Sequence, residues 1–250
     1  MFDRVDIPVS RQQQTCTGCG LNQLCLPVSM DAREISMLDD IVQRQPVMQR
    51  GEHLYHEGDP FRALYAVRAG SLKTYTTTES GEQQVTGFHL PGELVGLNAI
   101  NRWIHPCAAV SLETTSVCEL PFEKLEYLAA DLPDLQRQLL RVMSREIASD
   151  QDMLFTMARR NADERLAILL LDLSDRFGQR GLSATRFRLS MARGDLGNYL
   201  GLAPETMSRI FRRFQDQGWI HADGREVELL AVDKLEALAG RSASAAQESG

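Results

Sequence analysis

The chain has 250 residues, with 27 Lys and Arg against 34 Asp and Glu, a formal net charge of −7. That acidic balance excludes indiscriminate binding to polyanions, and the length allows one large or two modest domains with real cores. No apolar run approaches the roughly 20 residues that span a bilayer, and Met1–Pro8 lacks the pattern of a secretion signal. We therefore expect a cytoplasmic protein without a membrane segment, whose five cysteines are reduced thiols.

Three of the five cysteines, Cys16, Cys19 and Cys25, lie within ten residues of one another in a segment rich in Gly and small polar residues. Such a segment is typical of a loop, and closely spaced thiols on a loop can wrap one metal centre. The sequence therefore predicts an N-terminal metal-binding loop over residues 1–30. A fourth thiol, Cys107 or Cys118, would complete a set suited to an iron–sulfur cluster or a structural zinc, and spacing alone does not choose between these.

Residues 31–130 are interrupted by turn signals about every ten residues, which favours an all-β sandwich or roll. Segments rich in β-forming residues lie between the turns, at 64–68, 72–78 and 84–90.

Residues 131–160 predict one long helix, with Asp131 as its N-cap and Pro133 in its first turn. A nearly heptad stripe follows this helix: Leu139, Met143, Ile147, Asp150, Leu154 and Met157. So long a stripe after a β-domain predicts a dimer interface, although packing against the β-domain of the same chain would give the same pattern. Asp150 is the charged member of the stripe. Across a symmetric dimer two such carboxylates repel, unless Asp150 points off the seam into water.

Residues 161–240 predict a winged helix-turn-helix domain. A capping box at Asn161–Glu164 opens an amphipathic helix over 165–177. Gly201 ends a short helix and Pro204 opens the next, which is the spacing of a helix-turn-helix. A hairpin around Asp223–Gly224 forms the wing. The last residues, 241–250, are small and polar, and we expect them to be disordered.

The second helix of this motif has an apolar stripe and an opposite polar side. Glu205, Ser208 and Arg209 share the polar side near the N-terminus, where a recognition helix meets base edges in the major groove. Residues 186–213 contain six Arg against Asp195 and Glu205, a local balance of +4. A basic patch on an acidic chain indicates a defined docking surface for double-stranded DNA.

Six motifs in this chain resemble those of one protein family. They are Cys16-x2-Cys19-x5-Cys25, the segments 86–96 and 115–123, Asp150-Gln-Asp-Met, the segment 187–195 and Pro204-Glu-Thr-Met-Ser-Arg209. In combination they resemble the CRP/FNR superfamily of bacterial transcription regulators, and within it the oxygen-responsive FNR (fumarate and nitrate reduction) branch.

The resemblance implies an α+β protein with a cyclic-nucleotide-binding-like β-roll, a long dimerisation helix and a winged helix-turn-helix. It implies a [4Fe-4S] cluster bound by Cys16, Cys19, Cys25 and Cys118, which drives dimerisation and DNA binding without oxygen and so activates or represses genes of anaerobic metabolism. Cys107 then has no required role. Asp150, flanked by Met143, Ile147 and Leu154, matches the residue whose charge opposes dimerisation when the cluster is absent.

The resemblance also implies partners. Glu205, Ser208 and Arg209 would recognise TTGAT-type half-sites of a palindrome, and the loop 77–83 resembles one that contacts RNA polymerase. Gly20 departs from the Ser found in some members.

Three alternatives remain open. One is a regulator of the same scaffold with a small-molecule effector, but Pro106-Cys107 stands where a cyclic-nucleotide roll has its phosphate-binding Arg. Another is a DNA-binding protein with a structural zinc and no redox sensing. The third is an enzyme, but the sequence holds no nucleotide-binding glycine motif, nucleophile motif or second cluster motif, so we expect none.

Overall fold

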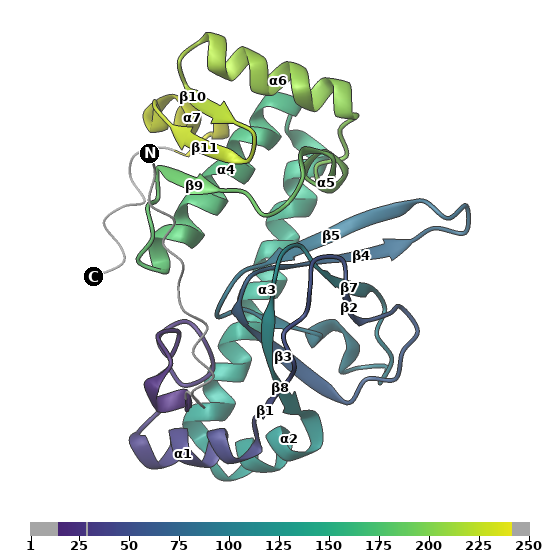
Figure 1. Cartoon of the computed structure of the whole chain (residues 1–250), viewed down its shortest axis with the longest axis vertical. Helices are drawn as coiled ribbons and strands as arrows, with labels where there is room; N and C mark the ends of the chain where they lie inside the picture. The colour runs from purple at the N-terminus through teal and green to yellow at the C-terminus, as the bar shows by residue number, and fades with distance from the viewer. Residues whose placement is uncertain (1–14, 29, 242–250) are drawn as a thin grey trace.

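The computed structural model describes residues 15–28 and 30–241. It shows a β-roll and a winged helix domain connected by one long helix, α3 (Figure 1), which confirms the expected α+β fold. The predicted disordered tail lies outside the described residues apart from Arg241, as does the part of the predicted N-terminal loop before Thr15. Among the described helices, none combines the length and the apolar character that a bilayer crossing requires.

The β-roll consists of two four-stranded antiparallel sheets, in the orders β1-β8-β3-β6 and β2-β7-β4-β5. The three predicted strands are present as β3, β4 and β5, and the shorter strands were not predicted. The bounds are β1 Gln43–Arg44, β2 His53–Tyr55, β3 Ala63–Ala69, β4 Leu72–Thr77, β5 Gln83–His89, β6 Leu94–Val95, β7 Ala108–Ser111 and β8 Ser116–Pro121, with a 3-10 turn, η2, at Leu97–Ala99.

Two helices pack beside the roll. Helix α1 (Ala32–Ile41) begins at a capping box, in which Asp31 accepts a hydrogen bond from the Glu34 backbone N–H and the Glu34 side chain accepts one from the Asp31 N–H. Helix α2 (Phe122–Asp131) follows β8 directly. Both were absent from the sequence-based expectation.

The predicted N-cap of α3 is wrong, because Asp131 is the last residue of α2 and α3 (Pro133–Arg159) begins after a break at Leu132. The break has a steric cause. The residue before a proline is pushed out of the α region, and Leu132 has φ −117° and ψ 95°. Pro133 opens α3 as expected.

The winged helix domain begins at Asn161, whose side chain accepts hydrogen bonds from the backbone N–H groups of Asp163 and Glu164, as the predicted capping box requires. The helix-turn-helix is confirmed: Gly201 lies in the left-handed region with φ +62° between its two helices. The bounds are α4 Ala162–Gln179, β9 Arg186–Arg188, α5 Arg193–Tyr199, α6 Pro204–Asp216, β10 Ile220–Asp223, β11 Glu226–Leu229 and α7 Val232–Ala239. The predicted hairpin is β10–β11, and β9 and α7 were not predicted.

The winged helix domain is packed against the β-roll of its own chain. Val85 and Phe88 of β5 belong to the same buried apolar cluster as the core of the domain. The Phe88 ring meets the Tyr199 ring edge-on at 5.1 Å between centroids. Lys73 of β4 forms an ion pair of 2.6 Å with Asp195 of α5. The position of the DNA-binding domain is therefore set by contacts with the roll as well as by the chain connection.

We predict that Asn161→Ala lowers the free energy of unfolding by about 1 kcal/mol, because it removes the acceptor for two helix N–H groups at the start of α4. Chemical denaturation of the purified protein measures this. Asn161→Asp, which keeps an acceptor oxygen, is the matched control and retains most of the stability. Equal loss in both variants would contradict a capping role.

Candidate metal centre and nucleic-acid interface

Four cysteines from two distant segments line one pocket. Cys16 begins the 3-10 turn η1 (Cys16–Gly18), Cys19 and Cys25 follow in the loop, and Cys118 lies on β8. The rest of the lining is mainly apolar and comes from the loop, α1, β3 and β8: Leu21, Leu26, Pro27, Leu38, Val42, Ala66, Val67 and Leu120, with Asn22 and Arg68. The fold thus brings the four predicted ligands together.

The start of the cysteine loop, residues 15–28, is held by an acid–base pair. The Cys16 backbone N–H donates to Asp39 Oδ1 of α1 at 3.0 Å, and the Arg44 guanidinium of β1 donates to the same oxygen at 2.7 Å. Arg44 is the register partner of Cys118 between β1 and β8. The loop and the strand that carry the thiols are therefore linked through one carboxylate.

The electrostatics of the pocket disfavour negative charge on the thiols alone. Burial raises the pKa of Cys16 and of Cys25 to about 12, and burial also raises the pKa of Cys118. Neighbouring thiols add mutual repulsion in each case. Four thiolates in this apolar pocket need a compensating cation, and thiolate sulfur selects iron–sulfur clusters, zinc or copper(I) over hard cations. The donor set therefore fits a thiophilic metal centre.

The thiols surround the pocket without closing on a single point. In residues 15–28 and 30–241, no group of three or more His, Cys, Asp or Glu side chains is arranged to hold one metal ion. All five cysteines are free thiols. Cys107, the other candidate for a fourth ligand, is 2% exposed in a separate apolar cluster of the roll and accepts a hydrogen bond from Asn98. The structure places Cys118, and not Cys107, with the loop thiols.

The stretch where a cyclic-nucleotide roll would have its arginine is filled with side chains. His105, like Cys107, is 2% exposed, and its ring stacks on Tyr55 at 3.6 Å between centroids. His105 and Cys107 are therefore part of the packed core of the roll, and Pro106 between them carries no charge for binding a phosphate.

Helix α6 presents its two sides as predicted. Its apolar residues are buried in the core of the domain: Met207, Ile210, Phe211 and Phe214. Glu205, Ser208 and Arg209 are exposed on the opposite side. The Arg193 guanidinium of α5 stacks on the Phe211 ring at 4.4 Å and fixes the two helices to each other. The exposed side chains are thus presented on a firmly held helix, the geometry that insertion into a major groove requires.

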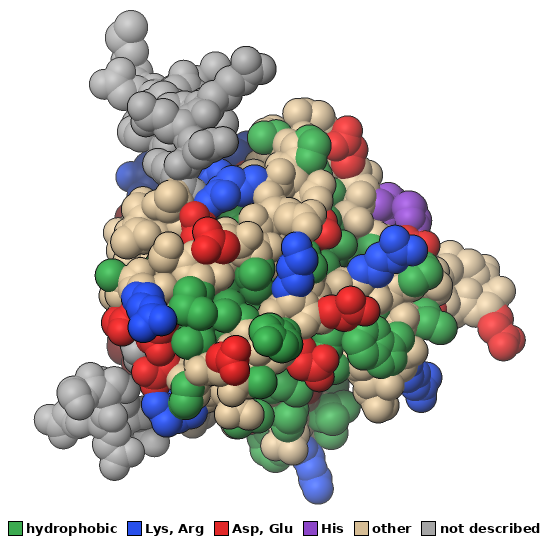
Figure 2. All heavy atoms as spheres, turned by 90° about the horizontal axis from the view of Figure 1, so that it is seen from below, with side chains coloured by type: hydrophobic (Ala, Val, Ile, Leu, Met, Phe, Trp, Pro, Cys, Tyr) green, Lys and Arg blue, Asp and Glu red, His purple; other side chains and the backbone are tan. Residues whose placement is uncertain are grey.

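Six arginines lie between residues 186 and 213 of the winged helix domain, three of them on α6. In Figure 2, which views the molecule from the end opposite α6, acidic and basic side chains are interspersed among hydrophobic ones. Arg186 and Arg188 of β9 lie in the winged helix domain with the arginines of α6. Arg209, Arg212 and Arg213 are exposed on α6 itself, so positive charge suited to a phosphate backbone lies beside Glu205 and Ser208.

Helix α3 carries an uncovered apolar stripe. The exposed members are Leu140, Met143, Ile147, Leu154 and Phe155, with exposed fractions between 36% and 71%. The two residues at the ends of the expected seam are partly buried within the subunit. Leu139 packs on the core beneath α3, and Met157 lies against Gly201, so that neither belongs to the exposed stripe. Successive side chains of a helix project about 100° apart, so Leu140, and not its neighbour Leu139, lies on the exposed side of α3.

Asp150 lies at the border of this stripe. It is exposed, and at 100° per residue it projects within about 40° of Met143 and Leu154. It also lines a polar cavity between α3, the roll and α4. A partner helix packed along the stripe would therefore meet Asp150 at the edge of the interface. This position is intermediate between the two that the sequence allowed, which are within the seam and off the seam in water.

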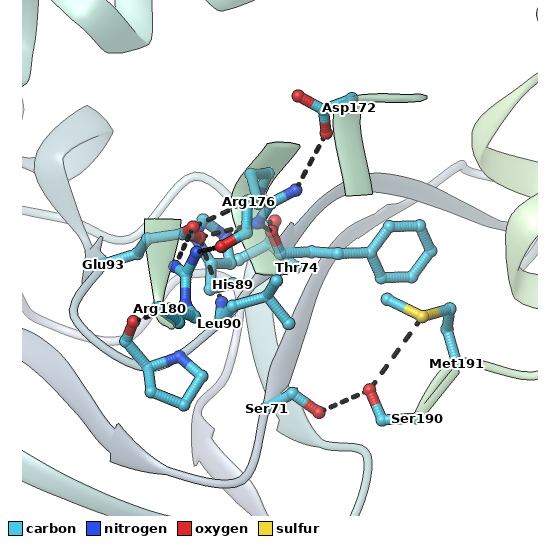
Figure 3. Close-up of polar contacts among 12 residues, drawn as sticks. Ser71, Thr74, His89, Leu90, Glu93, Asp172, Arg176, Arg180, Ser190 and Met191 are labelled. Carbon is cyan, nitrogen blue, oxygen red and sulfur yellow. Dashed lines mark hydrogen bonds and ion pairs between the residues drawn. The ribbon is translucent and has the colours of Figure 1, made fainter. Parts of the chain in front are cut away.

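One charged cluster was missed by the sequence-based interpretation. Glu93, in the turn before β6, binds Arg176 of α4 at 2.6 Å and Arg180, the C-cap of that helix, at 2.5 Å (Figure 3). The segment 86–96 was noted only as a family motif, and no local pattern links a glutamate of the roll to two arginines so far along the chain. The only signal in the sequence was the spacing of Arg176 and Arg180, which lie four residues apart and so on the same side of the predicted helix.

These parts define a DNA-binding protein with a winged helix-turn-helix domain and a β-roll, and comparison with known proteins agrees. Residues 46–131 match the cyclic nucleotide-binding domain family, and residues 164–238 match the Crp-like helix-turn-helix domain family.

Full-length relatives specify the family. The chain is 53% identical to the transcriptional activator protein Anr of Pseudomonas protegens, over 93% of this chain and 96% of that protein. It is 46% identical to the fumarate and nitrate reduction regulatory protein of Escherichia coli K12, over 92% of each. The structure of FixK2 from Bradyrhizobium japonicum superposes with a TM-score of 0.73 at 30% identity, over 79% of this chain and 97% of that one. The chain belongs to the CRP/FNR family of transcription regulators, which are not enzymes.

Proposed function

We propose that this regulator senses oxygen through a [4Fe-4S] cluster bound by Cys16, Cys19, Cys25 and Cys118. The observation that carries the proposal is the shared pocket of these four thiols. Such a set of thiols could bind either an iron–sulfur cluster or a structural zinc, and the similarity of the chain to FNR and Anr regulators favours the cluster.

When bound, such a cluster supplies an oxygen-labile link between the thiolates of the loop and that of β8. The effect on the protein follows from how the loop is packed. Leu26 is fully buried in the same apolar cluster as Leu135 of α3. Gln138 of α3 donates to the Cys25 carbonyl oxygen at 3.5 Å. Loosening of the loop therefore removes part of the surface on which α3 is seated.

The exposed stripe of α3 is proposed as the homodimer interface. Leu140, Met143, Ile147 and Leu154 would meet their copies across a two-fold axis, and the two Asp150 carboxylates at the edge of the seam would repel. The dimer is then stable only when α3 is firmly seated. This dependence couples the loop to association by a population shift.

Dimerisation in turn would allow recognition of a palindrome. Two copies of α6 spaced about one helical turn of DNA apart match two half-sites, with Glu205, Ser208 and Arg209 at the base edges of a TTGAT-type sequence. The loop 77–83 between β4 and β5 projects from the roll (Figure 1) and is the proposed contact with RNA polymerase. Because its partners are DNA and polymerase, we place the protein in the cytoplasm, where it activates or represses genes of anaerobic metabolism.

We predict that Cys118→Ala abolishes cluster assembly, because it removes the only proposed ligand outside the loop. Iron and sulfide analysis and visible absorption of protein purified without oxygen measure this. Cys107→Ala is the matched control and keeps full iron content. Loss of iron in the control alone would overturn the assignment of the fourth ligand, and a colourless wild-type protein containing zinc would overturn the proposed function.

We predict that Asp150→Ala strengthens dimerisation in air by up to about fivefold, the equivalent of ~1 kcal/mol for two unit charges about 4 Å apart in water. Sedimentation equilibrium measures the dissociation constant. Asp152→Ala removes an exposed acid two residues away, on another side of α3, and leaves it unchanged. An equal effect in both variants would reduce the role of Asp150 to net charge.

We predict that Arg209→Ala costs about 1–3 kcal/mol of specific DNA binding and relaxes the preference at one base pair. Titration against a set of operators, each with one base pair changed, measures this. Lys234→Ala, on α7 and away from α6, is the control for a lost positive charge. Uniform weakening on every operator would recast Arg209 as a phosphate contact.

A further inference from the structure

The turn before β6 touches both the cysteine loop and the DNA-binding domain. Gly92 lies in this turn with φ +92°, and a Cβ placed on it would lie 2.8 Å from the Cβ of Leu24. Leu24 precedes the ligand Cys25 in the loop. The next residue after Gly92 is Glu93, whose carboxylate binds α4 of the DNA-binding domain. Gly92 and Glu93 are adjacent in the chain, and they contact the cysteine loop and the DNA-binding domain respectively.

On the side of the DNA-binding domain, Glu93 is bound by Arg176 and Arg180 (Figure 3). We call these three residues the Glu93 clamp. Arg176 binds Glu93 through two parallel hydrogen bonds, from Nε at 3.1 Å and from a terminal nitrogen at 2.6 Å. The Arg180 guanidinium adds a bond of 2.5 Å to the same carboxylate and one of 2.8 Å to the Pro91 carbonyl oxygen. Bidentate arginine–carboxylate pairs fix orientation as well as distance. The clamp therefore holds α4 at one angle to the turn.

The charges in the clamp are compensated. Burial raises the pKa of the Glu93 carboxyl, but the guanidinium of Arg176 outweighs it and holds the pKa below its usual value. Burial lowers the pKa of the neighbouring His89 to about 4, so its ring is neutral at physiological pH. Removing the carboxylate would leave two partly buried guanidinium groups without their acid, which is more costly than losing an exposed pair.

The other contacts between the roll and the domain lie around α5. Asn198 accepts from the Val85 N–H at 2.5 Å and donates to the Gln83 carbonyl oxygen at 2.7 Å, and Ser71 donates to Ser190 at 2.6 Å. Of the contacts between roll and domain named above, the Glu93 clamp is the one that adjoins the cysteine loop. It borders a cavity of about 320 Å³ that Leu24 also lines, so the turn has room to shift.

We propose that the Gly92–Glu93 turn links the cysteine loop to the DNA-binding domain within one subunit, and that Glu93, through Arg176 and Arg180, sets the angle of that domain. The proposal rests on the proposed function, because it takes the state of the cysteine loop to depend on the cluster. The property that it controls is the angle of the DNA-binding domain, which is distinct from dimerisation. The domain is connected to α3 by only two residues, Arg160 and Asn161, so its angle, and hence the separation of the two α6 helices, depends on how it is docked.

The test is the selectivity of DNA binding for half-site spacing. The probe is an inverted repeat of TTGAT at the spacing that the wild-type protein prefers, compared with the same repeat lengthened by one or two base pairs. We expect Glu93→Gln, without oxygen, to reduce the affinity ratio between these operators by roughly tenfold, since hydrogen bonds to charged groups contribute more than neutral ones. A purely structural role would weaken binding to all operators equally and leave the ratio unchanged.

Matched variants separate the clamp from charge and from folding. Asp175→Asn makes the same charge change on α4, but Asp175 pairs with Arg241 inside the DNA-binding domain at 2.7 Å, so its ratio stays at the wild-type value. Arg180→Gln removes the clamp from the other side and lowers the ratio as Glu93→Gln does. The proposal is overturned if Asp175→Asn lowers the affinity ratio between the operators. It is also overturned if neither Glu93→Gln nor Arg180→Gln lowers that ratio.

Leu24→Ala tests the link to the loop. We expect it to lower the spacing ratio as Glu93→Gln does, while iron and sulfide content and the sedimentation behaviour without oxygen stay at wild-type values. An unchanged ratio overturns the link, and a fall in dimerisation parallel to that in DNA binding overturns the separate output. A wild-type protein without iron would defeat the proposed function, whereas the Glu93 variants would still decide whether the clamp positions the domain.

Discussion

The meeting of four sulfur atoms in one apolar pocket is the constraint on which the other parts of this protein depend. Three of the thiols lie on a short loop that has little core of its own, and the fourth lies on β8 in the middle of a sheet. Burial disfavours thiolates there, and so a bound metal centre that compensates their charge would hold the loop to the roll more firmly. Asp39, shared by Cys16 and Arg44, holds only the start of the loop. Its end is packed on α3 through Leu26 and the Cys25 carbonyl oxygen, and a metal centre bound by the thiols would add a further link between them.

In the proposed function, helix α3 would transmit the position of that loop to the dimer interface and the DNA-binding domain. Its first turns pack with Leu26 and the Cys25 carbonyl oxygen, its middle carries the uncovered stripe, and its end adjoins the DNA-binding domain. The Arg165 guanidinium ties this last junction, since it donates to the carbonyl oxygens of Met157, Arg160 and Leu200. Because packed cores switch between discrete arrangements rather than deforming continuously, a change at the first turns of α3 has consequences along its length.

The features predicted from sequence are those that local chemistry dictates. The capping box at Asn161, the left-handed Gly201 and the long strands each depend on residues close together in the chain. Helices α1 and α7 have ten and eight residues, too short for periodicity to stand out from chance. Leu139 and Leu140 are both apolar neighbours, and which one is exposed depends on what α3 packs against. The thiol pocket could be anticipated only because a resemblance supplied Cys118, and the Glu93 clamp needs the fold itself.

A dimer interface and a domain clamp that respond to the same loop would act on DNA binding additively in free energy. Moving a two-state equilibrium from 1:99 to 99:1 takes about 5.5 kcal/mol, whereas a single coupling between sites is typically about 1–3 kcal/mol. Neither the repulsion between two exposed carboxylates nor the loss of one clamp is large enough alone. A palindrome, however, is bound only by a dimer whose two domains are both correctly angled, so each subunit contributes its own clamp to the total. Three couplings, at one association surface and two clamps, would together supply about 3–9 kcal/mol, a range that includes the free energy of a decisive switch without any single contact being strong.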